Sequence, residues 1–201
     1  HPDDDVISMG GTFQRLIDQG HEVHVAYQTS GNIAVHDYDA LRYAEFMLEF
    51  SDRHGDISED ERKLYRKVIK FLQKKDSGMD DIPEVRSIKG LIRRGEARAG
   101  ARFTGADDSH IHFLDMPFYE TGRTRKKPLG EADIQLIVDL MERIKPHQVY
   151  AAGDLADPHG THRVCLDAIT EAFRRLDGKD WIKDCWLWMY RGAWHEWAVH
   201  E

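Results

Sequence analysis

The sequence is poor in cysteine, with only Cys165 and Cys185 among 201 residues. Their separation fits neither a metal-binding nor a redox motif, so we interpret both as small buried side chains in a reducing compartment and expect a cytoplasmic location. No apolar run approaches the roughly 20 residues that span a bilayer, and no signal peptide is visible. The sequence therefore predicts neither a membrane-spanning protein nor a disulfide-stabilised secreted one.

The sequence also lacks an excess of positive charge, internal repeats and a Gly-x-Gly-x-x-Gly fingerprint. Its net charge of −8 argues against general nucleic-acid binding, because affinity for phosphate depends on clustered Lys and Arg. Without the fingerprint, dinucleotide binding has no support. These absences argue against nucleic-acid-binding and dinucleotide-binding classes of protein.

Apolar periodicity predicts strands that alternate with helices along the whole chain. Expected strands cover 21–28, 110–114, 147–152 and 184–190, and expected helices cover 6–19, 38–54, 58–75, 84–100, 131–144 and 160–176. This alternation predicts an α/β fold, a Rossmann-like and mostly parallel sheet with helices on both faces, in one domain over residues 1–201. The segment of about 38–78 is interpreted as an inserted helical hairpin, which could serve as a lid, as a contact in a homo-oligomer or as simple packing.

A histidine and three carboxylates stand immediately before the first expected helix, in the run His1-Pro2-Asp3-Asp4-Asp5. His1 and Asp4 are three positions apart across one tight turn, so both side chains can reach a single ion, and imidazole with carboxylate suits zinc. Asp3 lies between them and faces elsewhere. The alternative is an acidic cap that complements the helix dipole, although it gives His1 no role.

A second group of candidate residues follows the apolar strand 149–152, where Asp157, His159 and His162 open another helix. Two histidines three residues apart at a strand-to-helix junction could supply a third metal ligand and a catalytic partner. The chain contains 12 histidines, so unrelated histidines at this position are the competing explanation.

These motifs resemble the signature of the PIG-L/LmbE family of zinc-dependent N-acetylglucosaminyl deacetylases. That family carries an Ala-His-Pro-Asp-Asp-Glu run, then Gly-Gly-Thr on the following helix, an Arg-x-x-Glu helix and a closing His-Pro-Asp-His run. The matching segments here are 1–5, 10–12, 93–96 and 159–162. They occur in the same order and span nearly the whole chain.

The resemblance implies that His1, Asp4 and His162 hold zinc (Zn2+) in an open site with one position for water. It makes Asp3 the general base, while His159 stabilises the tetrahedral intermediate and protonates the departing amine. The implied reaction is hydrolysis of the acetamide of an N-acetylglucosamine derivative to acetate and a free amino sugar.

The resemblance also assigns Arg93 to substrate hydroxyl or phosphate oxygens, although a surface arginine that pairs with a nearby glutamate is the alternative. Asp157 would orient His159 or His162, or would be a plain turn residue. Three features depart from the family pattern. Asp5 replaces a glutamate, the segment 160–161 replaces Pro-Asp, and Phe118 and Tyr119 stand near the register of a sugar-binding aspartate.

The segments 114–122 and 190–197 bring the resemblance closest to deacetylase-like domains fused behind a glucosamine-6-phosphate deaminase domain in some bacteria. That resemblance implies a deaminase domain as partner, a phosphorylated N-acetylated amino sugar as substrate, and a strand ahead of His1. Two other functions remain open. One is a non-catalytic sugar- or metal-binding regulatory domain, and the other is a metallohydrolase that acts on a different amide.

Overall fold

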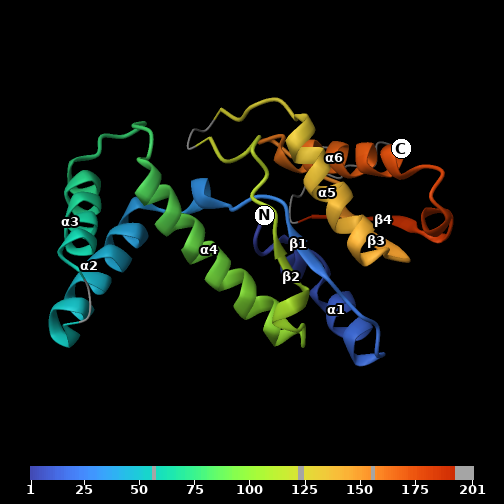
Figure 1. Cartoon of the computed structure of the whole chain (residues 1–201), viewed down its shortest axis with the longest axis horizontal. Coiled ribbons are helices and arrows are strands. Elements are labelled where there is room, and N and C mark those ends of the chain that lie inside the picture. Colours follow the sequence, from blue (N-terminus) through green and yellow to red (C-terminus); the bar gives the residue numbers. More distant parts are fainter. Residues whose placement is uncertain (56–57, 122–124, 155–156, 193–201) are drawn as a thin grey trace, which may run out of the picture.

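The computed structural model describes residues 1–55, 58–121, 125–154 and 157–192. Figure 1 shows the elements in chain order. The helices are α1 (Asp4–Asp18), α2 (Asp37–His54), α3 (Glu59–Lys74), α4 (Pro83–Phe103), α5 (Glu131–Ile144) and α6 (Thr161–Leu176). The strands are β1 (Val25–Tyr27), β2 (Ile111–Phe113), β3 (Gln148–Ala152) and β4 (Trp186–Tyr190), and short 3₁₀ turns cover η1 (Asn32–Ala34), η2 (Asp108–His110) and η3 (Asp180–Asp184).

All strand pairing among the described residues is parallel. β1 pairs with β2 in the register Val25↔Ile111, and β3 pairs with β4 in the register Gln148↔Trp186. The α/β class and the parallel pairing are therefore confirmed. The single sheet expected from the sequence is not seen, because the described strands form two separate two-stranded sheets.

The two sheets are separated by a cavity of about 730 Å³ that is lined by residues of both β1 and β3. Apolar side chains of α1, α5 and α6 form much of its wall, including Phe13, Met141 and Ile169. His1, Asp4 and His162 line the same cavity. β1 and β3 therefore lie on two sides of one apolar space instead of hydrogen-bonding to each other.

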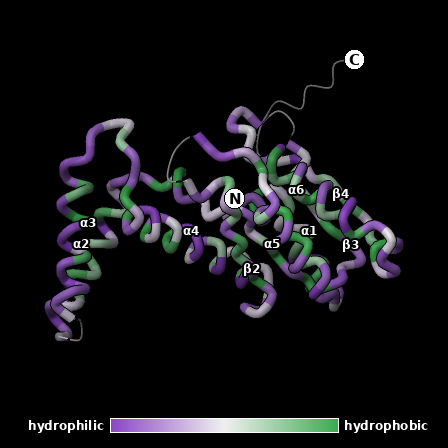
Figure 2. Tube along the Cα trace, turned by 45° about the horizontal axis from the view of Figure 1, so that its top comes forward, coloured by the Kyte–Doolittle hydropathy of each residue, from purple (hydrophilic) through white to green (hydrophobic). Residues whose placement is uncertain are grey.

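The main hydrophobic core lies where α5 and α6 cover β3 and β4. Met116, Phe118 and Leu176 are its largest fully buried side chains. Figure 2 shows hydrophobic stretches where α5, α6 and β3 come together. This core fixes the start of α6, which carries His162.

Helices α2 and α3 lie together at one end of the molecule, and α4 runs from them towards the N-terminus (Figure 1). Ser58 begins α3 with a capping box to Glu61, as the sequence pattern predicts. The ammonium group of Lys89 is buried and lies 2.6 Å from Asp37 and 2.7 Å from Asp81, which ties α2 to α4. The two helices of the predicted hairpin are thus present. That they form an insertion remains a prediction. None of the helices in the described ranges has the length and apolar character needed to cross a bilayer.

Candidate metal centre

The turn that enters α1 holds the first motif in a fixed conformation. Asp3 has a φ of 103°, in the left-handed region, and its carbonyl accepts the Ile7 amide at 2.9 Å. Asp4 therefore stands in the first turn of α1. Gly31 packs closely against Pro2 in this turn. Its φ is 69°, and a Cβ there would lie 3.0 Å from Pro2 Cδ, so the position favours glycine.

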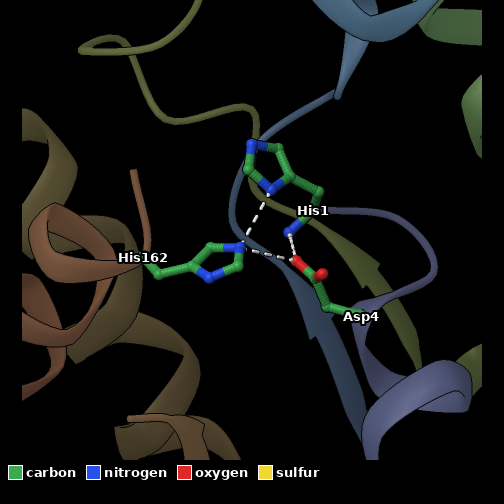
Figure 3. Close-up of side chains that lie close together, drawn as sticks. All are labelled: His1, Asp4 and His162. Atoms are coloured by element: carbon green, nitrogen blue, oxygen red, sulfur yellow. Dashed lines mark hydrogen bonds and ion pairs between the residues drawn. The ribbon is translucent and has the colours of Figure 1, made fainter. Parts of the chain in front are cut away.

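The structure brings together the three residues predicted as metal ligands (Figure 3). His162 Nε2 lies 3.3 Å from Nδ1 of His1 and 3.2 Å from Oδ2 of Asp4. The backbone nitrogen of His1 lies 2.6 Å from the same Asp4 oxygen. Two ring nitrogens and one carboxylate oxygen thus converge from the start of α1 and the first turn of α6.

This donor set fits a zinc ion. Zinc prefers imidazole nitrogen and carboxylate oxygen at about 2.0–2.2 Å, so its ligand atoms lie about 3–4 Å apart around one ion. The distances of 3.2 Å and 3.3 Å have that scale. Three protein ligands also leave a coordination position for water or substrate, which is the pattern of catalytic rather than structural zinc sites.

The charges in the cluster support a bound cation. Burial would raise the pKa of Asp4, but the hydrogen bond from His162 and the positive charge around this carboxylate lower it to about 2. Burial would lower the pKa of His162, but its hydrogen bond and charge attraction to Asp4 raise it above the ordinary value. In the metal-free protein, the positive charge beside the Asp4 carboxylate therefore lies where a divalent ion would bind. The bound ion would take over the role of that charge.

Asp154 is a functional candidate that the sequence reasoning missed. Its Oδ2 lies 3.0 Å from Nδ1 of His162, and its side chain is 1% exposed. Its Oδ1 accepts the Gly192 amide at 2.7 Å. A carboxylate behind a ligating histidine fixes the orientation of the ring and its protonated nitrogen. In the sequence, the indication of this role is the position of Asp154, two residues after the strand that ends at Ala152.

Asp157 acts on the backbone at the start of α6. Its two oxygens accept the amides of His159 and His162, each at 2.9 Å. Burial would raise its pKa, but these two backbone hydrogen bonds lower it. Asp157 thus positions the peptide that carries His162, whereas Asp154 contacts the imidazole ring.

Arg93 of α4 is tied to the first motif. It donates to Asp3 Oδ2 at 2.6 Å, to Glu96 Oε2 at 2.6 Å and to the carbonyl of Pro2. Burial would lower the pKa of this guanidinium, but the hydrogen bond and the charge of Asp3 raise it. Arg93 therefore both pairs with a nearby glutamate, as the alternative reading has it, and holds the carboxylate predicted to be the general base.

His159 lies outside the three-ligand cluster. Its side chain is exposed and lines a hollow with the segment 125–128 and with Arg163. Lys126 in that segment donates to Thr161 Oγ1, beside His162, and its ammonium group lies 5.3 Å from the centre of the Tyr119 ring. Burial lowers the pKa of Lys126. The sequence predicted no role for Lys126 individually.

Aromatic and polar side chains surround the His1 side of the cluster. The Tyr119 ring packs edge-on against His1, with ring centres 5.6 Å apart, and is almost fully buried. Glu120 accepts the Ser30 amide at 3.0 Å and the Asn32 side-chain amide at 2.9 Å. The loop of residues 29–33 after β1 is therefore fixed next to the site.

An α/β chain that presents an open His–Asp–His set at the starts of two helices has the features of a metal-dependent hydrolase. A sequence profile of the family described as GlcNAc-PI de-N-acetylase (PIG-L) matches residues 1–173. The chain therefore belongs to the PIG-L family, which confirms the resemblance predicted from its motifs. The description of this family is that of an N-deacetylase acting on a GlcNAc-containing compound.

A protein of Bacteroides thetaiotaomicron described as "glucosamine-6-phosphate deaminase-like protein" is 52% identical over 205 residues. The alignment covers 100% of this chain and 31% of that protein, so the chain spans about a third of the length of this relative. No solved structure matches the chain.

Proposed function

We propose that the chain is a zinc-dependent N-deacetylase that hydrolyses the acetamide of an N-acetylglucosamine derivative to acetate and a free amino sugar. The observation that carries this proposal is the convergence of His1 Nδ1, Asp4 Oδ2 and His162 Nε2. Membership of the PIG-L family supplies the reaction class.

His1, Asp4 and His162 would hold the ion, with Asp154 behind His162 and Asp157 beneath its backbone. When bound, zinc lowers the pKa of water to about 7 and polarises a carbonyl oxygen, which are the two requirements of amide hydrolysis at neutral pH. The residues of the chain then orient the substrate and move the protons.

Asp3 would accept the proton of the attacking water, because its carboxylate adjoins the ligands and is absent from the three-ligand set. Its hydrogen bond to Arg93 holds it in one orientation. His159 would give a proton to the departing amine nitrogen. Its side chain is exposed on the hollow at the start of α6, where a substrate can reach it from solvent.

A phosphorylated sugar is the substrate class we favour. The hollow beside His159 is lined by four basic side chains, Arg125, Lys126, Lys127 and Arg163, with Asp167 as its acidic residue. Phosphate is bound by clustered lysine and arginine groups. Deacetylation of such a substrate yields an amino-sugar phosphate, which is the kind of compound that a deaminase domain, as in the name of the relative, would consume.

Acetate release tests the proposal directly. Zinc-loaded protein should release acetate from N-acetylglucosamine 6-phosphate faster than from N-acetylglucosamine, and a chelator should stop both reactions. His162→Ala should lose the zinc of this site together with activity, because two remaining ligands do not hold a tight site. An unchanged zinc content in His162→Ala relative to the unaltered chain would overturn the ligand assignment, and equal rates on the two sugars would overturn the preference for phosphate.

A non-catalytic domain that binds a sugar or a metal is the second candidate. Two observations favour it: Asp3 is engaged in an ion pair with Arg93, and His159 stands outside the ligand cluster. This candidate predicts zinc binding without acetate release from any member of a panel of N-acetylated sugars. Acetate release that depends on zinc would exclude it.

A further inference from the structure

A second group of imidazole and carboxylate side chains lies at the beginning of β1 and β2. Glu22 and His24 precede β1, and His110 precedes β2. The register Val25↔Ile111 places His24 beside His110, and it pairs Ala26 with His112. The ring of His24 lies 4.1 Å from that of His110 and 5.2 Å from that of His112, centre to centre, so the three imidazoles gather at the start of this sheet.

Three of these side chains direct ligand atoms at one point. Glu22 Oε1 lies 2.9 Å from Nε2 of His24 and 4.0 Å from Nε2 of His110. All three atoms lie within 4.8 Å of one another. The rings of His24 and His110 face each other with centres 4.1 Å apart. Ligand atoms around one zinc ion lie about 3–4 Å apart, so small side-chain movements complete a shared site.

His112 supplies the support that ligating histidines usually have. Its Nε2 lies 2.9 Å from Nδ1 of His24, so a proton on Nδ1 of His24 is donated to His112. In that tautomer, the Nε2 lone pair of His24 would be available to an ion held with Glu22 and His110, whereas without metal Nε2–H donates to Glu22. Ligating histidines almost always donate their other ring N–H to an acceptor, which fixes the orientation of the ring.

The group is also open to solvent on one side. The side chain of Glu22 is 73% exposed, whereas those of His24 and His110 are 17% and 29% exposed. An ion can therefore enter from water and keep a water ligand. The alternative is a simple hydrogen bond between Glu22 and His24. It explains that pair, but it does not explain why His110 converges on the same point or why His112 contacts His24.

We propose that Glu22, His24 and His110 form a second metal site, suited to zinc by its two imidazoles and one carboxylate, with His112 as a positioning residue. None of these residues belongs to the His1–Asp4–His162 set, so the proposal is independent of the deacetylase activity. The ion would join β1 to β2 and stabilise the folded chain by mass action.

Equilibrium dialysis of the 201-residue chain against Zn2+, followed by elemental analysis, tests the proposal. We expect two equivalents of zinc in the unaltered chain and one in each of His24→Ala, His110→Ala and His162→Ala. The double variant His110→Ala/His162→Ala should bind none. His21→Ala, which changes an exposed neighbouring histidine outside the cluster, is the matched control and should keep two.

Two further variants keep the test decisive if the partly buried histidine variants fold poorly. Glu22→Gln removes the carboxylate at an exposed position, and in the His162→Ala background it should abolish the rise in melting temperature that Zn2+ causes. His112→Ala should weaken the second equivalent about 10–100-fold without removing it. A single equivalent that His162→Ala abolishes, or two equivalents retained in Glu22→Gln and His110→Ala, would overturn the proposal.

Discussion

Oδ2 of Asp154 lies 3.0 Å from Nδ1 of His162, while the other oxygen of the same carboxylate accepts the amide of Gly192 at 2.7 Å. The carboxylate is thus held between a backbone group near the end of the described chain and the ring of a predicted zinc ligand. This contact directs Nε2 of His162 towards His1 and Asp4. The proposed metal centre therefore depends on residues 191–192 after β4 as well as on the two motif turns.

Gly192→Ala is expected to weaken zinc binding about 10–100-fold, because changes behind a ligating histidine have effects of that size. A Cβ at Gly192 would overlap the Asp154 carboxylate and push it away from His162. Asp154→Asn should have a similar effect, since it removes the charge behind the ring. Gly178→Ala, at a glycine with no atom near its Cβ position, is the control for a glycine change elsewhere, although its φ of 90° will cost some stability. Unchanged zinc affinity in both Gly192→Ala and Asp154→Asn would contradict the role of this contact.

Asp3→Asn is expected to keep zinc and to lower kcat about 10²–10⁴-fold, the usual contribution of a positioned acid or base. The amide can still accept a hydrogen bond from Arg93, so the turn should stay intact. Glu96→Gln, which alters the other carboxylate paired with Arg93, is the matched control and should leave kcat close to normal. Near-normal kcat in metal-replete Asp3→Asn would exclude the general-base role.

Arg93→Ala is expected to raise KM more than it lowers kcat if the guanidinium contacts the sugar or its phosphate, because such a contact contributes uniform binding. The ion pair between Arg93 and Asp3 adds a second expectation, a fall in kcat as Asp3 loses its anchor. Arg93→Lys keeps the charge but not the forked geometry, so its KM and kcat should lie between those of the unaltered chain and those of Arg93→Ala. If KM is unchanged in Arg93→Ala, the arginine positions Asp3 and does not bind substrate.

Zinc affinity is expected to rise with pH, because the ion displaces a proton from His162, whose pKa lies above its ordinary value of 6.5. Calorimetry in buffers of different ionisation enthalpy should detect proton release on binding near pH 6.5. In the metal-free chain, the His162 contribution to stability is fully present below pH 6.5 and is lost as pH rises through its raised pKa. The Asp4 contribution is present above 3.8 and is lost as pH falls through about 2. A melting temperature of the metal-free chain that is constant from pH 5 to pH 9 would contradict this coupling.

Local patterns in the sequence predicted the helices well. The range 131–144 coincides with α5, and the Ser58–Glu61 pattern forms the expected capping box. Such features depend on residues within one or two turns of each other, so the sequence contains the information directly. The convergence of His1, Asp4 and His162 in the structure matches the set that the motif resemblance implied.

Features that depend on distant segments were not predictable in the same way. The expected strand 21–28 is reduced to Val25–Tyr27, because a strand extends only as far as its partner allows. Asp154 carries no motif, and its contact with Gly192 joins residues 38 positions apart. The grouping of His24 with His110 requires the register between β1 and β2, which alternation within a single segment does not specify.

The cavity between the two sheets leaves one edge of β1 and one edge of β3 without a strand partner among the described residues. Unpaired strand edges are templates on which another extended chain can add hydrogen bonds, and apolar walls favour its burial. An extended segment of another chain would suit this space. The chain is therefore expected to self-associate by edge-to-edge pairing at high concentration, and light scattering should fall when a soluble β-strand peptide competes for the edges.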